Sequence, residues 1–180
     1  MLLNDTAELP LSQLALHSAF SRDKMYTLAD LEDLVDYALR RGIEVVPEID
    51  VPAHVRSWGA APAFRGIVVN CSRTASAAQT PVNVYLINPT DPLAIKVIAA
   101  VIRQIAAVFT TSRYLHIGGD EVHFDCWRED ETVAAELRAR NATVESALRT
   151  FEAVVFALVR AVDKVLTAQT RLASSLRLWL

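Results

Sequence analysis

The stretch from Tyr114 to Val122 limits the fold of this chain more than any other. It reads Tyr-Leu-His-Ile-Gly-Gly-Asp-Glu-Val, so an apolar segment ends in two glycines and two adjacent carboxylates. The apolar part suits a buried parallel strand, and the glycines let a ligand approach the backbone closely. Parallel α/β folds place their active sites at the carboxyl ends of such strands. The motif therefore predicts a site at Asp120 and Glu121, although an acidic turn without chemistry would give the same short motif.

Residues 42–54 show the same pattern of an apolar segment that ends in acidic residues. They form a second apolar segment, Gly-Ile-Glu-Val-Val-Pro-Glu-Ile-Asp-Val-Pro-Ala-His, whose end carries carboxylates and a histidine. Apolar residues recur at helical spacing before this segment, over 28–39, and again after it, over 93–109. Alternation of helix and strand is typical of parallel α/β folds.

These patterns give a full set of expected elements. In chain order they are a loop-rich lead-in over 1–26, a helix capped by Thr27 and ended by Gly42, a strand over 43–49, a long connection over 52–90, a helix that starts at 90–92 and runs through 93–109, a strand over 114–118, helices over 129–140 and 144–166, and a strand over 176–180. A connection as long as the one over 52–90 is usually functional when it lies inside a compact domain.

Length and charge set further limits. The 180 residues suffice for one domain with a sizeable core, and a hydrophobic fraction of 52% argues for an ordered globular protein. A net charge of −3 gives no reason to expect nucleic acid as a partner. The most apolar stretches, 95–109 and 151–166, contain charged residues, which argues against a membrane span. A complete (β/α)₈ barrel typically needs about 250 residues, so a chain of this length would hold only part of one.

Taken together, the two acidic stretches resemble the motifs of the family 20 glycoside hydrolases, the β-N-acetylhexosaminidases. Those motifs read approximately P-E-[FIL]-D-x-P-G-H and H-[LI]-G-G-D-E-V. The second is intact here, and the first has Ala53 in place of a glycine. The Ile-Asn-Pro-Thr tract over 87–90 and the Cys-Trp pair at 126–127 also fit, most closely the lysosomal and secreted animal-type enzymes. The resemblance covers residues 26–138 and becomes weaker on either side.

This resemblance implies a fold of the α/β class, a partial (β/α)₈ TIM barrel with roughly strands 3 to 5 and their helices. Residues 27–180 would form this part of the catalytic barrel, after the lead-in over 1–26. The barrel of the family is larger and follows a separate N-terminal domain. We therefore expect the chain to be a fragment of the catalytic domain.

The resemblance also implies an activity, the removal of terminal non-reducing β-linked N-acetylhexosamine (GlcNAc or GalNAc). The reaction retains configuration, and the acetamido oxygen of the substrate acts as the nucleophile. Glu121 matches the general acid/base, and Asp120 matches the carboxylate that orients the acetamido group. His54 matches the motif histidine, which implies a hydrogen bond that tunes Glu121. Adjacent side chains of a strand point to opposite faces, so the chain must turn at residues 118–120 to bring both acids to the substrate.

Three further residues are expected to bind substrate. Asp50 and Glu48 lie at the end of the first acidic strand and would join the polar network of the pocket. Trp179 matches one of the tryptophans that line the acetamido pocket in the family. Ala53 adds a Cβ where the family has none, so a requirement for positive φ at this position would strain the loop that carries His54.

A metal site is the alternative interpretation of the acid pair together with His116, His123 and Asp125. The sequence contains no His-Glu-x-x-His motif, and residues that alternate along a strand face opposite ways. We therefore expect no metal and no other cofactor, and we interpret His116 as a packing or supporting residue.

Cys71 and Cys126 are the only cysteines of the chain. By default two cysteines are two unpaired thiols, but both positions match a disulfide of the lysosomal-type enzymes. Asn-X-Ser/Thr sequons begin at Asn4, Asn70 and Asn141. Together, these features favour a lysosomal or secreted location.

The expected partner is a glycan, a glycoconjugate or a chitin-type oligosaccharide, and a dimer of the full-length protein is a further hypothesis. A second hypothesis belongs to a different class: a truncated, catalytically inactive remnant or a sugar-binding protein. It is motivated by the family's sugar-clamping arginine and last-strand residues, whose positions fall outside this sequence.

Overall fold

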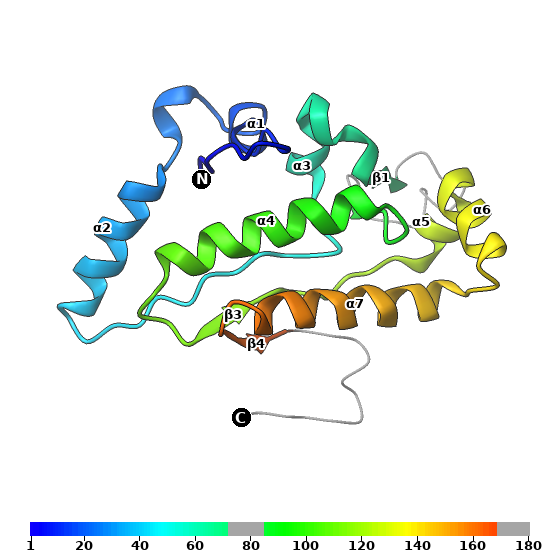
Figure 1. Cartoon of the computed structure of the whole chain (residues 1–180). Coiled ribbons are helices and arrows are strands. Elements are labelled where there is room, and N and C mark those ends of the chain that lie inside the picture. Colours follow the sequence, from blue (N-terminus) through cyan, green and yellow to red (C-terminus); the bar gives the residue numbers. More distant parts are fainter. Residues whose placement is uncertain (72–84, 169–180) are drawn as a thin grey trace.

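The computed structural model describes residues 1–71 and 85–168 of the chain, and helices account for most of them (Figure 1). The α-helices are α1 (Ser12–Leu16), α2 (Leu28–Leu39), α3 (Arg56–Ala60), α4 (Pro92–Val108), α5 (Phe124–Glu129), α6 (Glu131–Ala139) and α7 (Val144–Arg160). The described part also contains the 3₁₀ helices η1 (Arg22–Lys24) and η2 (Pro62–Ile67), and the strands β1 (Val68–Asn70), β2 (Tyr85–Ile87), β3 (Tyr114–His116) and β4 (Val165–Thr167).

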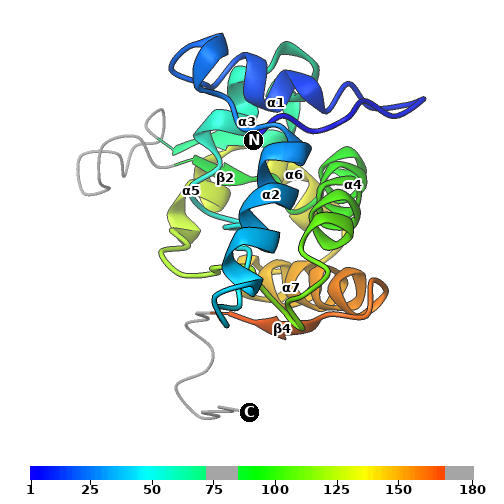
Figure 2. The ribbon, with the colours of Figure 1, turned by 90° about the vertical axis from the view of Figure 1, so that its left-hand side faces the viewer.

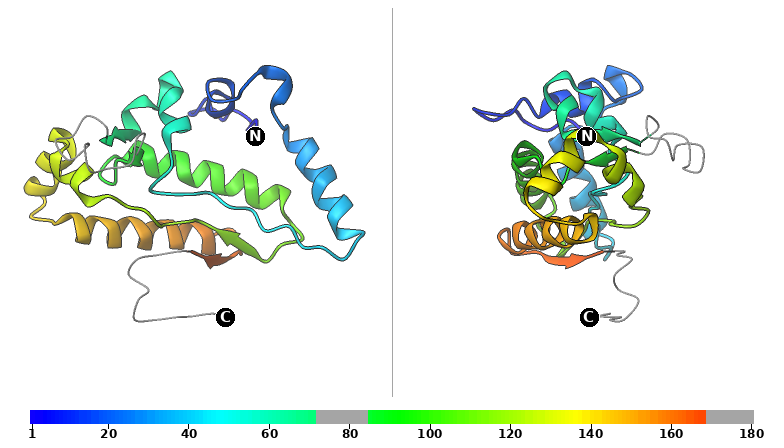
Figure 3. Two further views of the ribbon diagram at one scale, coloured as in Figure 1. Left: turned by 180° about the vertical axis from the view of Figure 1, so that it is seen from behind. Right: turned by 90° about the vertical axis from the view of Figure 1, so that its right-hand side faces the viewer.

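β3 lies at the centre of a small parallel arrangement. On one side it pairs in parallel with β4. On the other side residues 47–51 run along it: the Ile49 N–H donates to the His116 carbonyl (2.8 Å), and the Val51 N–H donates to the Ile117 carbonyl (3.0 Å). Seen from behind, the two segments cross the molecule side by side (Figure 3). The predicted parallel α/β organisation is therefore present, and the carboxyl ends of these segments lie at the same edge.

The strand expected over 43–49 and the connection expected over 52–90 differ from the structure. The strand expected over 43–49 pairs only at its end, where Glu48 bridges His116. The connection over 52–90 is more than a loop, because it contains α3, η2 and the antiparallel pair β1–β2. These elements are too short to give a periodic pattern in the sequence. The strand expected over 176–180 lies outside the described residues.

The helix predicted over 144–166 is wrong in its last turns, because α7 ends at Arg160 and β4 follows. Asp163 has a φ of 57°, which turns the chain out of the helical path. The ammonium group of Lys164 then donates to the Phe109 carbonyl at the end of α4 (2.7 Å). Pairing with β3 and this contact outweigh the apolar pattern that would have continued the helix.

Side-chain caps fix where several helices begin. Thr27 and Asp30 cap α2 reciprocally, as the sequence predicts. The Asp91 carboxylate accepts the N–H of Leu93 (2.8 Å) and starts α4 at the expected place. Asp130 does the same for α6, and for this reason the helix expected to begin at residue 129 begins two residues later.

The main hydrophobic core forms around α4, which packs against α7, α2 and η2. Nine of its seventeen residues are buried. Ile98 and Ile102 of this helix, together with Leu115 and Ile117 of the central parallel segment, are at most 2% exposed. A second cluster surrounds Trp127, whose indole N–H donates to a main-chain carbonyl (3.0 Å). Both cores lie directly behind the strand ends that carry the acidic motifs.

In the N-terminal part of the chain, residues 1–26 pack against the core, whereas α2 is largely exposed. Residues 1–26 contribute buried leucines such as Leu11, and the main chain of Asn4 bonds to the amide of Gln104 on α4 (2.8 and 2.7 Å). α2 lies at one end of the molecule (Figure 1) and faces the viewer when the molecule is seen from that side (Figure 2). Only two of its twelve residues are buried. Within the described ranges, no helix has the length and apolar character needed to cross a membrane.

Candidate active site

The two acidic strand ends meet at His54. Its Nε2 lies 3.2 Å from Oε2 of Glu121 and 3.9 Å from Oδ2 of Asp50. These side chains come from adjacent parallel segments, which bring together residues that lie far apart in the sequence. The histidine–glutamate contact implied by the resemblance is present in the geometry. Its role in catalysis is a separate question.

The chain turns sharply after β3. Gly118 and Gly119 have φ values of 61° and 95°, and Glu121 follows with a φ of 53°. Glycine adopts such values easily, whereas a glutamate does so at a cost. A Cβ at Gly118 would overlap the carboxylate of Asp50, so the first glycine is needed for close approach as well as for its φ. The turn predicted at residues 118–120 is present, and it brings Glu121 to His54.

Asp50 lies between the two strand ends. Its Oδ1 accepts the N–H of Gly119 (3.4 Å), and its side chain is 29% exposed. Burial raises the pKa of Asp50 above its usual range. The Gly119 hydrogen bond and the charge of His54 oppose this rise, while the nearby Asp120 and Glu48 add to it. The carboxylate therefore lies in a partly dry, negatively charged environment.

Ala53, the departure from the family motif, is fully buried at 1% exposure. The left-handed backbone conformation falls on the next residue, His54, with a φ of 58°. Ala53 itself is not among the residues with positive φ, so the condition under which the sequence predicts strain there is not met.

Glu48 and His116 form a second pair beside the first. Oε2 of Glu48 lies 2.9 Å from Nδ1 of His116, and the N–H of Gly118 donates to the same nitrogen (3.1 Å). His116, interpreted from the sequence as a packing or supporting residue, therefore has a partner in Glu48, which lies opposite it in the parallel pairing of the two acidic segments.

Asp50, His54 and Asp120 each place one donor atom within 4.8 Å of the others, so this group could hold a cation. Strand alternation, one of the two grounds for expecting no metal, does not apply at Asp120, because the turn ends the alternation. Within this group, Oδ1 of Asp50 accepts the Gly119 N–H, and Nε2 of His54 contacts Glu121.

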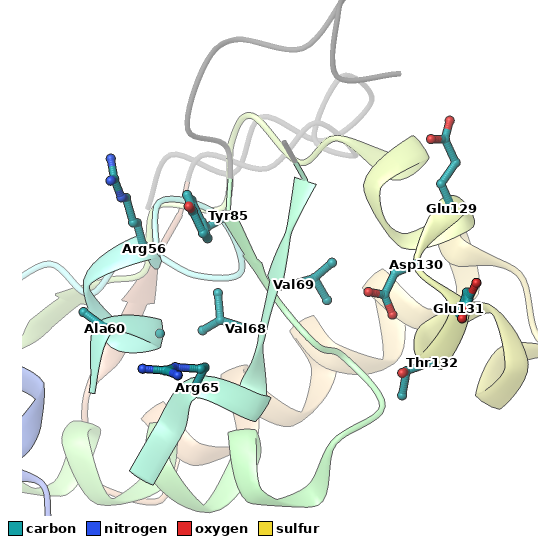
Figure 4. Close-up of a pocket in the computed structure, with 11 residues that line it drawn as sticks. Arg56, Ala60, Arg65, Val68, Val69, Tyr85, Glu129, Asp130, Glu131 and Thr132 are labelled. Carbon is teal, nitrogen blue, oxygen red and sulfur yellow. The ribbon is translucent and has the colours of Figure 1, made fainter. Parts of the chain in front are cut away.

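Two cavities lie near this region. One, of about 260 Å³, is lined by Asp50, His54 and Trp58, among others, so it opens directly beside the strand ends. The other, of about 700 Å³, separates Arg56, Arg65 and Tyr85 from the acidic residues 129–131 (Figure 4). Neither Asp120 nor Glu121 lines this larger cavity. Trp179, predicted to bind substrate, lies outside the described residues.

Cys71 and Cys126 form a disulfide, with 4.9 Å between their Cα atoms. The predicted pairing is confirmed. The bond joins the chain just after β1 to α5, which follows the Glu121 turn. Both cysteines are buried, at 0% and 2% exposure, in the cluster around Trp127.

Comparison with solved structures identifies the fold as part of a TIM-barrel-type α/β domain. A family 20 exo-β-N-acetylglucosaminidase from Vibrio harveyi, in complex with N-acetylglucosamine, matches 80% of this chain with a TM-score of 0.67 and 27% identity, over 22% of its own length. A chitobiase from Flavobacterium johnsoniae matches 91% of this chain with a TM-score of 0.69, over 24% of its own length.

The sequence profile of the glycosyl hydrolase family 20 catalytic domain matches residues 8–173. The chain therefore belongs to glycosyl hydrolase family 20. β-Hexosaminidase subunit alpha of Mus musculus is 33% identical over 129 residues, which cover 71% of this chain and 23% of that protein. β-Hexosaminidase 3 of Arabidopsis thaliana is 31% identical over 144 residues, which cover 80% and 24%. The chain thus spans about a quarter of the length of these relatives.

Proposed function

We propose that this chain is part of a β-N-acetylhexosaminidase that removes terminal β-linked N-acetylhexosamine from glycans or chitin-type oligomers. Its relatives are named β-hexosaminidases, and family membership supports the same chemistry here. The observation that carries the proposal is the contact between His54 and Glu121, with Asp120 next in the chain. In this proposal residues 47–51, β3 and β4 are strands 3 to 5 of the barrel.

The proposed mechanism assigns a separate task to each acid. Glu121 donates a proton to the leaving oxygen while the acetamido oxygen of the substrate attacks the anomeric carbon. Asp120 orients the acetamido group and stabilises the positive charge that develops on it. Glu121, now ionised, then activates the water that opens the oxazolinium intermediate. His54 positions the Glu121 carboxyl and balances its charge as the proton leaves and returns.

Asp50 and Glu48 support this site in different ways. Asp50 holds the Gly119 amide and lies near His54, so it connects the histidine to the turn that carries both acids. Glu48 lies beside the 260 Å³ cavity together with Asp50 and His54. We propose that this cavity is a part of the substrate pocket that the rest of the barrel completes.

The test requires a polypeptide that supplies the complete barrel. It should hydrolyse an aryl N-acetyl-β-glucosaminide and leave the matching glucoside, which lacks the acetamido group, essentially uncleaved. Equal turnover of both substrates would contradict substrate assistance. No turnover of either would contradict the proposed activity.

The inactive-remnant hypothesis has its own supporting observation in α2. Leu34, Tyr37 and Leu39 of this helix are 49–53% exposed, which leaves a broad apolar face uncovered. We expect the 180-residue chain by itself to be poorly folded and to show no hexosaminidase turnover. A monomeric, cooperatively unfolding and active preparation of the 180 residues would refute this expectation.

We propose that the protein matures in the secretory pathway, and the Cys71–Cys126 disulfide supports an oxidising compartment. Asn141 lies exposed in the turn between α6 and α7, where it begins an Asn-Ala-Thr sequon. Secreted expression in a eukaryotic host should therefore give a glycosidase-sensitive mass at Asn141 that Thr143→Ala removes. An unmodified Asn141 in the secreted protein would argue against this part of the proposal.

A further inference from the structure

The turn that carries Asp120 and Glu121 is held by one side chain of its own strand, His116 of β3, and one of the neighbouring segment, Asp50. The last ladder bond of this segment is made by Ile117, whose N–H donates to the Thr167 carbonyl (3.0 Å). The next two amides, those of Gly118 and Gly119, bond instead to Nδ1 of His116 and to Oδ1 of Asp50. The positive φ values of the turn depend on these acceptors, because no strand continues to fix the backbone.

The His116 bond is the shorter of the two, 3.1 Å against 3.4 Å. The main chain of His116 is itself fixed by two hydrogen bonds to the segment 47–51, since its N–H donates to the Pro47 carbonyl (2.9 Å) and its carbonyl accepts from Ile49 (2.8 Å). The imidazole, with its side chain 24% exposed, therefore projects from a rigid point. A rigid acceptor four residues before Asp120 is well placed to set the direction of the turn.

This bond specifies the protonation of the ring. A nitrogen of a neutral imidazole carries either a proton or a lone pair in the ring plane, never both. Nδ1 can accept from the Gly118 N–H only with its lone pair free. The tautomer of His116 that holds the turn therefore carries its proton on Nε2. Oε2 of Glu48 lies 2.9 Å from the same Nδ1, where an ionised carboxylate would favour a proton. Glu48 and the Gly118 amide therefore compete for one atom.

We infer that His116 is a positioning residue for the acid pair, which acts through Nδ1 on the Gly118 amide, and that Glu48 competes for this nitrogen. The inference rests on the proposed hexosaminidase function for its effect on turnover, but not for the hydrogen bond itself. In the Nε2–H form the ring fixes the turn and so directs Asp120 and Glu121. In the Nδ1–H form the ring pairs with Glu48, and the Gly118 amide loses its acceptor.

Side-chain shape provides a sharp test. The Oδ1 atom of asparagine occupies nearly the same position along the side chain as Nδ1 of histidine, whereas the polar end of glutamine reaches the position of Nε2. His116→Asn should therefore keep the acceptor for Gly118, and His116→Gln and His116→Ala should lose it. A role in packing alone would make the asparagine and glutamine variants equivalent. His17→Ala, at the exposed C-cap of α1, is the matched control.

Two measurements on the enzyme with a complete barrel separate the outcomes. The first is backbone hydrogen exchange in the peptide that spans residues 117–122. The second is kcat and KM on an N-acetyl-β-glucosaminide. We expect His116→Gln and His116→Ala to speed exchange and to lower kcat by up to about 100-fold with KM little changed, since small misplacements of catalytic groups cost that much. His116→Asn should restore slow exchange and most of kcat.

Glu48→Ala tests the competition, because removal of the carboxylate leaves Nδ1 to Gly118. Exchange in the same peptide should then be equal or slower, and faster exchange would overturn this part of the inference. Equal exchange and equal kcat for the asparagine and glutamine variants would overturn the positioning role. A wild-type enzyme without turnover would refute the proposed function, and the exchange series would still decide whether His116 holds the turn.

Discussion

The strand ends that carry the candidate site and the packed helices α4 and α7 differ in almost every structural respect. At the site, His54 and Glu121 both have positive φ, and their side chains are 49% and 62% exposed. In the helices, Ile98, Val155 and Val159 are fully buried and the backbone is regular. The parallel segment around β3 belongs to both regions, because Leu115 and Ile117 are buried in the core and its end is polar.

The contrast assigns stability and chemistry to different parts of the chain. Buried apolar side chains supply the free energy of folding, whereas strained and half-exposed polar residues add little to it or reduce it. Substitutions at the strand ends should therefore change turnover and leave unfolding nearly unchanged. Substitutions in the helix pair and its supports should do the reverse. Each prediction below concerns the enzyme with a complete barrel.

The largest expected effect is at Glu121. Glu121→Gln preserves the size of the side chain and its hydrogen bond to His54, but it removes the proton that the leaving group needs. We expect kcat to fall by about 10²–10⁴-fold, the usual contribution of a general acid, with an unchanged urea midpoint. Steady-state kinetics with an unactivated N-acetylglucosaminide and equilibrium unfolding measure the two quantities.

Glu136→Gln is the matched control, because this exposed glutamate of α6 pairs only with Arg140 four residues later. It should change neither quantity measurably, since exposed pairs of this kind contribute little. Near-normal hydrolysis by Glu121→Gln would remove Glu121 from the mechanism.

The second effect is on stability. The Cys71–Cys126 bond spans 55 positions of sequence. In the chain-entropy model a loop of this size is worth about 4 kcal/mol. Replacement of both cysteines by alanine should lower the unfolding free energy by about this amount and change kcat of the folded enzyme only a few-fold. A variant as stable as wild type would show that the bond adds nothing to the fold.

The third prediction compares two helices that look equally amphipathic in the sequence. Ile98→Ala on α4 should cost about 2–5 kcal/mol, because it empties space in a closed core. Leu34→Ala on α2 removes a half-exposed side chain and should cost less than about 1 kcal/mol. A cost as large as that of Ile98→Ala would indicate that other parts of the barrel cover α2.

These two helices also show how far the sequence could predict the structure. Caps and apolar spacing located α2 and α4 almost to the residue, since both signals are local. The exposure of α2 depends on its neighbours, and no local pattern carries that information. The end of α7 was mispredicted for a similar reason: pairing of β4 with β3 is a long-range contact that overrides a helical pattern.

At the site, motif order was enough to place Glu121, Asp120 and His54 at neighbouring strand ends. The link between Glu48 and His116 was missed because it depends on the register of two parallel segments, and that register is set by hydrogen bonds that the sequence does not show. The positive φ of His54 was not predicted either, because Ala53, one residue earlier, is the position that departs from the motif.

The smallest expected effect brings the two regions into one experiment. Burial raises the pKa of Asp50 at the site and that of Glu152 on α7. A carboxyl group with a raised folded-state pKa binds its proton more tightly in the folded protein than in the unfolded chain. The contribution of the protonated carboxyl to the free energy of unfolding is therefore complete below the unfolded-state pKa, near 3.8 for Asp50 and 4.5 for Glu152. This contribution is lost as the pH rises through the folded-state pKa.

Asp50→Asn and Glu152→Gln should consequently both stabilise the fold at pH 7, and neither should do so near pH 3. Only Asp50→Asn should lower kcat, because the carboxylate of Asp50 helps to hold the turn and lies beside His54, while Glu152 lies in the scaffold. Urea unfolding at the two pH values, together with kcat at pH 7, measures all four quantities. A stabilised Asp50→Asn enzyme with undiminished turnover would mean that the raised pKa reflects burial alone, and the division between a chemical and a structural region would then have to exclude Asp50.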